Sequence, residues 1–298
     1  MGSLLAKCQG TFFIWEDLKM KKTIKIAFYG KGGIGKSTIA SNTAVAFAST
    51  GLKVLFIGCD PKADSVKNIT GRKIIPIIRG IIEKGDLLKQ EDFLQRGFLN
   101  IACIETGGPS PGVGCAGRGI ISMVEELEKH NIFDQNWDVI IYDVLGDVVC
   151  GGFAVPMRDG YIDSVYIVSS GEYMSIYAAN NILKSINAFS SNRDPFLGGI
   201  IYNQRQNNAE FSLMEKFSEK VKVPLITQIP FSKKLILSEL EHKTVLEKFP
   251  NSDIAQVFLE LSNKILNSSG KVIPNPLTEN EIDEMSLEYL ERMSGELQ

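Results

Sequence analysis

Short apolar runs alternate with helical patterns along most of the chain. The run Ile24–Tyr29 predicts a buried strand, and residues 38–49, rich in alanine and other small residues, predict a helix packed on a sheet. Further strands are expected at residues 53–57, 99–104, 137–142, 164–169 and 198–202. Strands that alternate with helices favour an α/β fold with a doubly wound, mostly parallel sheet. One domain is therefore expected over residues 21–268.

A C-terminal helical tail is predicted over residues 269–298. Thr278 and Glu281 have the spacing of a capping box. Apolar residues then fall near one helical face, namely Ile282, Met285, Leu290, Met293 and Leu297. Such an apolar stripe is expected to pack against another surface. That surface could belong to its own domain or to a second subunit.

Composition narrows the function classes. Hydrophobic residues make up 44% and charged residues 22% of the 298 residues, which supports a buried core. The net charge of -3 lacks the basic excess of a nucleic-acid-binding protein, and no apolar run reaches the ~18 residues of a membrane span. Residues 1–20 are interrupted by Glu16 and Asp17 and lack a secretory cleavage pattern, so a flexible extension or an upstream start before Met20 is expected. We expect a cytoplasmic protein with neither nucleic acid nor membrane as a partner.

A glycine-rich run follows the first strand. Residues 30–38 read GKGGIGKST and fit G-x-x-x-x-G-K-[ST], with a strand before and a helix after. Glycines let backbone N–H groups surround phosphate oxygens, and the helix N-terminus adds positive potential. Lys36 is expected to neutralise the β- and γ-phosphates and the Ser37 hydroxyl to bind Mg²⁺. The predicted nucleotide-binding residues of this loop are Gly30, Lys31, Gly32, Gly33, Ile34, Gly35, Lys36, Ser37 and Thr38.

Four carboxylates follow two of the predicted strands. Asp60 and Asp64 come after residues 53–57, and Asp143 and Asp147 come after residues 137–142. Because ligands of open α/β sheets bind at the carboxyl ends of strands, all four can approach the γ-phosphate and Mg²⁺. Asp143 closes an apolar strand, as the Walker B acid does. Asp147 or Asp60 could orient the attacking water.

Lys31 is a second lysine within the glycine-rich run. With it, the run resembles the deviant Walker A loop of the septum-positioning, plasmid-partitioning, iron–sulfur scaffold and nitrogenase iron-protein ATPases. In that family the extra lysine reaches across a dimer interface to the partner's nucleotide. The resemblance implies a homodimer in which MgATP binding and dimerisation are coupled. The expected catalytic residues are Lys31, Lys36, Asp60, Asp64 and Asp147.

The five cysteines give a poor disulfide framework, because their number is odd and no short paired spacing occurs. Cys115 lies in ETGGPSPGVGCAGRG and Cys150 in DVLGDVVCGGFAVP, and both strings resemble the nitrogenase iron protein and its tetrapyrrole-reducing relatives. In that family these cysteines from two subunits hold one 4Fe–4S cluster. A cubane needs about four thiolates, and a two-fold axis doubles two into four. Cys59 and Cys103 are expected to be core residues, and Cys8 lies in the N-terminal extension.

The resemblance extends from Lys25 to about Asn267. It implies that Asn203 contacts adenine, that Glu239 belongs to a nucleotide-side loop, and that Arg118 docks the partner and can be ADP-ribosylated. The implied function is an ATP-dependent iron–sulfur reductase. It would take electrons from a low-potential ferredoxin or flavodoxin and pass them singly to a nitrogenase or nitrogenase-like catalytic component, in a transient complex coupled to ATP hydrolysis.

Three segments depart from the family pattern. The family usually reads Arg-Asp-Asn where this chain has residues 231–233, Thr-Arg at residues 66–67, and Glu-Asn-Lys at residues 159–161. The last change replaces a docking-face lysine with Tyr161. A reductase for a tetrapyrrole or another substrate than N₂ is therefore an alternative. A cluster scaffold is less favoured because no late C-x-x-C pair occurs, and a partition ATPase because the C-terminal segment is acidic.

Asp143 and Cys150 are seven residues apart on one segment. Extended, this segment spans at most about 25 Å, and Gly146 gives it a joint. We hypothesise that loss of the γ-phosphate shifts residues 143–147 and with them the cluster. A bulky residue at position 146 would then uncouple hydrolysis from electron transfer.

Overall fold

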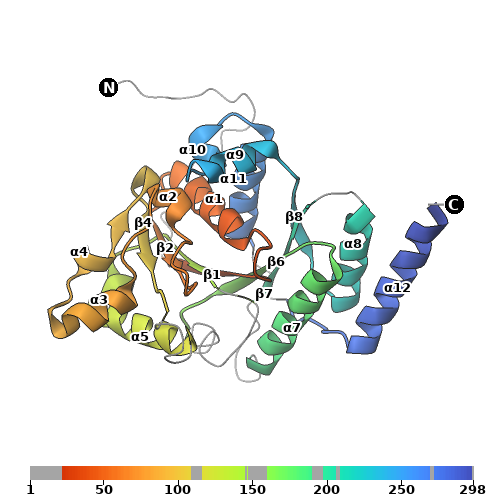
Figure 1. The fold of residues 1–298 in the computed structure, drawn as a ribbon, viewed down its shortest axis with the longest axis horizontal. Helices are drawn as coiled ribbons and strands as arrows, with labels where there is room; N and C mark the ends of the chain where they lie inside the picture. The colour runs from red at the N-terminus through yellow and green to blue at the C-terminus, as the bar shows by residue number, and fades with distance from the viewer. Residues whose placement is uncertain are drawn as a thin grey trace.

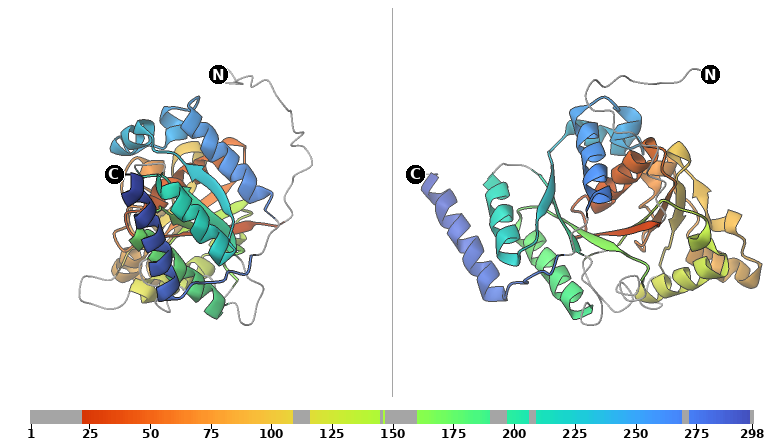
Figure 2. Two further views of the ribbon diagram at one scale, coloured as in Figure 1. Left: turned by 90° about the vertical axis from the view of Figure 1, so that its right-hand side faces the viewer. Right: turned by 180° about the vertical axis from the view of Figure 1, so that it is seen from behind.

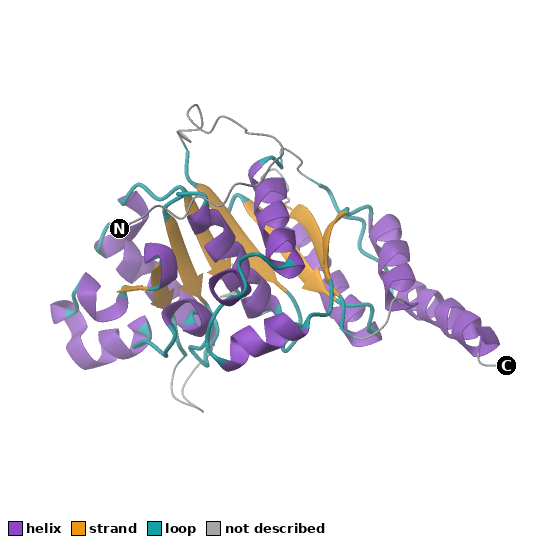
Figure 3. Cartoon of the chain, turned by 90° about the horizontal axis from the view of Figure 1, so that it is seen from above, coloured by secondary structure: helices purple, strands orange, loops and turns teal. Residues whose placement is uncertain are grey.

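An eight-stranded sheet forms the centre of the molecule. The computed structural model describes residues 22–108, 116–144, 146, 160–189, 197–205, 209–268 and 272–296. The strands are β1 (Ile24–Tyr29), β2 (Val54–Gly58), β3 (Gln95–Arg96), β4 (Ala102–Glu105), β5 (Val139–Asp143), β6 (Ser164–Ser169), β7 (Leu197–Asn203) and β8 (Leu225–Ile229). Their order is β3-β4-β2-β5-β1-β6-β7-β8, and all pairs are parallel except β3 with β4. Figure 3 shows the sheet between its covering helices.

Helices cover both faces of the sheet and make two hydrophobic cores (Figure 1). One face carries α1 (Lys36–Ser49), α2 (Lys67–Thr70), α9 (Lys233–Leu240), α10 (Val245–Lys248) and α11 (Asp253–Leu266). The other carries α3 (Ile77–Lys84), α4 (Gln90–Phe93), α5 (Ala116–Lys129), α7 (Tyr173–Phe189) and α8 (Ala209–Val221). Successive strand residues face opposite cores, as Ile26 and Ala27 do. The predicted α/β class with a doubly wound, mostly parallel sheet is confirmed.

The strands depart from the prediction by one or two residues at β2, β5 and β7, and by more at β4 and at the unpredicted strands β3 and β8. Leu99 and Asn100 have φ of 51° and 60°, in the left-handed region, so the chain turns there and β4 starts at Ala102. The prediction that this strand begins at residue 99 was wrong. Strand β8 was not predicted, because its sequence LITQI carries two polar residues and is only partly buried.

The C-terminal helix α12 (Glu279–Glu296) packs on its own chain, outside α8 (Figure 2). Thr278 and Glu281 exchange capping-box hydrogen bonds, and Ile282 and Met285 are buried in the core under α7 and α8. The buried Asn180 side chain both donates to the Leu277 carbonyl (2.8 Å) and accepts from its N–H (2.7 Å). The part of the apolar stripe described by the structure is thus covered within one subunit.

None of the described helices combines the length and hydropathy required of a membrane span.

Candidate functional site

Four residues from adjacent strands lie in one row at the carboxyl edge of the sheet. Asp143, the last residue of β5, pairs in register with Phe28 of β1 on one side and Gly58 of β2 on the other. Gly58 in turn pairs with Glu105 at the end of β4. The loops that follow these strands therefore emerge together, where open α/β sheets bind ligands.

The P-loop (residues 30–38) joins β1 to the N-terminus of α1. Gly33 and Gly35 have φ of 75° and 92°, which side-chain-bearing residues rarely adopt. A Cβ at Gly35 would also lie 2.6 Å from the Asn203 amide nitrogen. The residue types of the loop are thus required both by its backbone conformation and by its neighbours.

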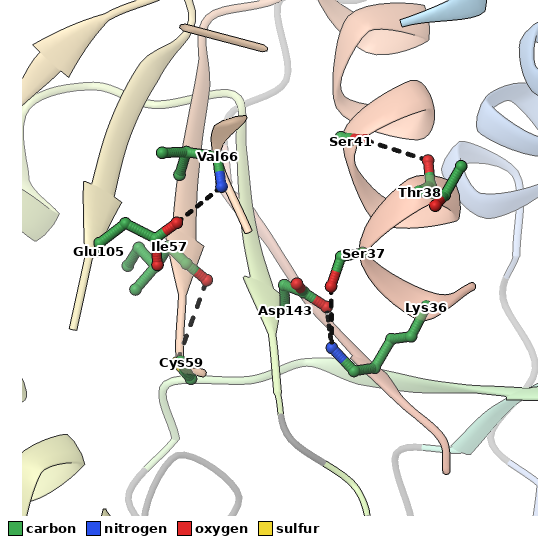
Figure 4. Close-up of polar contacts among 9 residues, drawn as sticks. All are labelled: Lys36, Ser37, Thr38, Ser41, Ile57, Cys59, Val66, Glu105 and Asp143. Carbon is green, nitrogen blue, oxygen red and sulfur yellow. Dashed lines mark hydrogen bonds and ion pairs between the residues drawn. The ribbon is translucent and has the colours of Figure 1, made fainter. Parts of the chain in front are cut away.

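Lys36 and Asp143 form a buried ion pair behind the P-loop (Figure 4). Lys36 is 6% exposed and Asp143 fully buried, and Lys36 Nζ also lies 3.5 Å from Ser37 Oγ. The second carboxylate oxygen, Asp143 Oδ2, is buried and has no hydrogen-bond partner among the described residues. The sequence predicted all three residues, and the structure brings them together.

Three side chains, two at the exit of β7 and one from α9, clamp the P-loop. Asn203 Nδ2 donates to the Ile34 carbonyl (2.7 Å), and Arg205 Nη1 donates to the Gly33 carbonyl (2.9 Å). The Thr38 hydroxyl donates to Glu239 Oε1. Asn203 and Glu239 were predicted near the nucleotide, whereas Arg205 was missed. Its position two residues after Asn203, at the same strand exit, was the available signal.

A cavity of about 390 Å³ opens beside this clamp. Its lining includes Gly35, Thr38, Asn203, Arg205, Phe231 and Glu239. The Phe231 side chain is 55% exposed at its rim. The neighbouring Ser232 caps α9 by accepting from Lys234 N–H (3.3 Å), so this departure from the family pattern retains a helix cap. A concave site with an aromatic wall and a few polar groups suits a planar heterocycle.

The acidic loop (residues 59–66) follows β2. Asp60 is partly buried and accepts from the nearby Lys62 N–H (2.9 Å), and Asp64 is exposed. Neither carboxylate forms an ion pair with another described residue. Lys31, in the P-loop, also makes no side-chain hydrogen bond or ion pair within the described ranges. These three predicted catalytic groups lie at the same edge of the sheet without strong partners.

Gly146, three residues beyond the end of β5, lies against the P-loop backbone. A Cβ at this position would come 2.1 Å from the Gly30 carbonyl oxygen. The residue was predicted as a joint for its conformational freedom. The structure adds a second requirement, the lack of space for any side chain.

Asp147, Cys115 and Cys150 lie outside the described residues, as does residue 159 of the departing segment. Arg118 is exposed on α5.

Cys59 and Cys103 are free and buried in the two cores, as predicted, and burial raises the pKa of Cys59 to about 12. Within the described ranges, no group of three or more His, Cys, Asp or Glu residues could hold a metal.

Comparison with known proteins decides the family. The model of the 4Fe-4S iron sulfur cluster binding proteins, NifH/frxC family, matches residues 24–292. The chain belongs to this family. Among similar relatives, nitrogenase iron protein 2 of Methanobacterium ivanovii is 49% identical, over 87% of this chain and 97% of its own length. The nitrogenase iron protein of Methanococcus voltae is 45% identical, over 91% and 99%.

Solved structures of lower identity share the fold of this NifH/frxC family member. A ParA family ATPase from Chlorobium tepidum has a TM-score of 0.64 at 20% identity, covering 81% of this chain and 99% of its own. The septum site-determining protein MinD of Pyrococcus horikoshii, complexed with Mg-ADP, has a TM-score of 0.65 at 19% identity, covering 84% and 98%. Both likenesses support the P-loop ATPase fold.

Family membership settles the general chemistry. The chain is an ATP-hydrolysing iron–sulfur oxidoreductase that uses a 4Fe–4S cluster and MgATP. The predicted resemblance to nitrogenase iron proteins is confirmed.

Proposed function

We propose that the chain acts as a homodimer that passes single electrons to a nitrogenase catalytic component, coupled to hydrolysis of MgATP. The observation that carries this proposal is the family match over residues 24–292, a range that contains Cys115 and Cys150. The relatives reported above are named nitrogenase iron proteins, which favours nitrogenase over a tetrapyrrole-reducing partner. At position 161 the family usually has a docking-face lysine, and this chain has Tyr161. The docking surface for the catalytic component therefore lacks that positive charge.

The nucleotide would bind in the P-loop. Lys36 is held by Asp143, and entering phosphates would compete for its ammonium group because they carry more negative charge. Asp143, released from the pair and with no partner for Oδ2 among the described residues, would face Mg²⁺ bound by the Ser37 hydroxyl. A buried orphan oxygen and a backbone cradle of residues 30–38 both fit MgATP.

The adenine base would occupy the 390 Å³ cavity. The Asn203 Nδ2–H group donates a hydrogen bond to the P-loop. Its Oδ1 is thus left to accept a hydrogen bond from the exocyclic amine of adenine. Phe231 at the rim would stack on the base. Glu239, bonded to Thr38, would hold α9 against the phosphate side.

Hydrolysis would use the acids of the other loops. Asp60 or Asp147 would orient the attacking water, with Asp64 near the γ-phosphate and Mg²⁺. Lys31 would reach the nucleotide of the second subunit, where a lysine with no ion-pair partner among the described residues of its own chain can stabilise transferred charge.

Cys115 and Cys150 of each of two subunits would hold one 4Fe–4S cluster, which supplies single-electron chemistry when bound. Arg118 would dock the partner from the exposed start of α5. The electron donor would be a low-potential ferredoxin or flavodoxin. The proposed compartment is the cytoplasm, whose reducing conditions keep thiols free.

Anaerobic purification with iron counting tests the proposal. We expect about four irons per dimer, as one cubane on a two-fold axis requires, and faster removal of iron by a ferrous chelator once MgATP is added. Electron delivery to a purified nitrogenase component, compared with a tetrapyrrole-reducing component, then identifies the partner. A protein that stays free of iron after reconstitution while hydrolysing ATP would disprove the reductase function.

A further inference from the structure

Glu105 is a fully buried carboxyl group that no step of the proposed function uses. It ends β4, in register with Gly58 and two strands from Asp143. A Cβ at position 58 would lie 2.3 Å from Glu105 Oε2, so the absence of a side chain on β2 lets the carboxyl group lie over that strand. The group thus reaches the loop that follows β2.

One hydrogen bond fastens this carboxyl group to the end of the acidic loop. Glu105 Oε1 accepts from the Val66 backbone N–H at 2.7 Å (Figure 4). Val66 directly precedes α2 and lies two residues beyond Asp64. The other oxygen, Oε2, and the neighbouring Ser65 hydroxyl are buried without partners among the described residues.

The residues after Glu105 contact two further elements. Position 108 lies against the acidic loop, since a Cβ on Gly108 would be 2.8 Å from Pro61 Cβ. The Gly107 carbonyl oxygen is 3.5 Å from where a Cβ of Gly119 would lie, in the first turns of α5 and beside Arg118. Residues 105–108 therefore lie between the acidic loop and the start of α5.

We propose that Glu105 is a positioning residue, which holds the acidic loop against residues 105–108 and so passes a movement of Asp60 and Asp64 to the start of α5. This inference rests on the proposed function, because it takes the acidic loop to face the nucleotide and Arg118 to face the partner. It differs from the hypothesis about residues 143–150 in using another strand and another loop.

The charges around Glu105 make the link sensitive to the nucleotide. Burial, together with the carboxylates of Asp143, Asp64 and Asp60, raises the pKa of Glu105 to about 8, although the hydrogen bond from Val66 lowers it. The Cys59 and Cys103 thiols also lie close, and Lys36 is the cation that faces Asp143 and Cys59. Mg²⁺ brought to these acids would offset their charge and favour release of the proton from Glu105.

Hydrogen exchange on the cluster-loaded dimer tests the link. In Glu105→Ala, the Val66 amide should exchange roughly tenfold faster, because its acceptor is lost. The change that MgATP causes in the exchange of residues 116–120 should disappear, while MgATP affinity at pH 7 stays within about threefold. Glu105→Gln keeps an acceptor oxygen and should restore both exchange patterns. Glu83→Gln, on the exposed face of α3, is the matched control.

A pH profile separates positioning from a merely structural role. Because MgATP binding would release the proton of Glu105, wild-type affinity should rise up to about pH 8 relative to Glu105→Gln and then run parallel to it. Should Glu105→Ala fail to fold, Glu105→Asp, one methylene too short to reach Val66, takes its place.

An unchanged MgATP response at residues 116–120 in the Ala or Asp variant would overturn the inference, as would parallel wild-type and Gln profiles below pH 8. Absence of MgATP binding by the wild-type protein would instead overturn the proposed function.

Discussion

The P-loop and the acidic loop emerge at the same edge of the sheet, on either side of β5, but their side chains are held differently. The P-loop is clamped from outside by Asn203, Arg205 and the Thr38–Glu239 bond. Among the described residues, the acidic loop is held by fewer side-chain contacts, from Val66 to Glu105 and from Cys59 to Thr106. A loop held at many points keeps its shape when a ligand binds, whereas a loop held at few points can move and report the ligand. The first suits nucleotide binding and the second suits signalling.

Replacing Lys36 should have the largest effect on the P-loop. Lys36→Ala leaves Asp143 buried without a cation, which should lower the free energy of unfolding by roughly 3–5 kcal/mol. ATP hydrolysis should fall by roughly a thousandfold or more, since phosphate charge is no longer neutralised. Denaturant unfolding and phosphate release measure the two effects.

The double variant Lys36→Ala with Asp143→Asn is the control. It should recover most of the stability but none of the hydrolysis. Recovery of both would show that the pair has no role at the nucleotide.

Titrating Glu105 tests the weakly held side. Its pKa in the folded state, about 8, is above the unfolded value of 4.5, so its contribution to stability is complete below pH 4.5 and is lost as pH rises through 8. The wild type should therefore lose on the order of 3 kcal/mol between pH 5 and pH 8 relative to Glu105→Gln. Urea unfolding at a series of pH values measures the difference. The prediction would be contradicted if the free energy of unfolding fell with pH at the same slope in both proteins.

Gly146→Ala tests the contact between the segment after β5 and the P-loop. The new Cβ would overlap the Gly30 backbone, so MgATP affinity should fall roughly a hundredfold, in addition to any loss of coupling. Gly51→Ala is the control for a glycine replacement without a clash, since nothing lies within 4 Å of the new Cβ, although its φ of 89° is itself unfavourable for alanine. Calorimetric titration with MgATP compares them. Tight binding by Gly146→Ala would mean that the P-loop tolerates displacement.

Phe231→Ala, at the rim of the cavity beside the P-loop, should give the smallest effect. Loss of stacking should raise KM for ATP roughly tenfold with kcat unchanged, because the base contacts the protein equally in ground and transition states. Leu240→Ala, exposed at the end of α9, should leave both constants unchanged. A fall in kcat alone would place Phe231 in the catalytic step.

The comparison also shows where sequence reasoning stops. The P-loop was predicted residue by residue, because its glycines, lysines and hydroxyls follow one another along the chain. Arg205 and Glu105 were missed because their partners, Gly33 and Val66, are far away in sequence. The left-handed turn at Leu99 was missed because neither Leu99 nor Asn100 belongs to a turn signal strong enough to interrupt an apolar run.

The sequence by itself determined the α/β class, the phosphate loop, the two cysteine-bearing strings and the family, since each depends on local order of residue types. The tertiary structure decided which groups meet at the sheet edge: Asp143 with Lys36, Asn203 with the P-loop, and Glu105 with Val66. It also decided that Ile282 and Met285, the described part of the apolar stripe of α12, are covered by their own subunit. These contacts arise from strand order and register, which bring distant segments together, and periodicity along the chain does not encode that order.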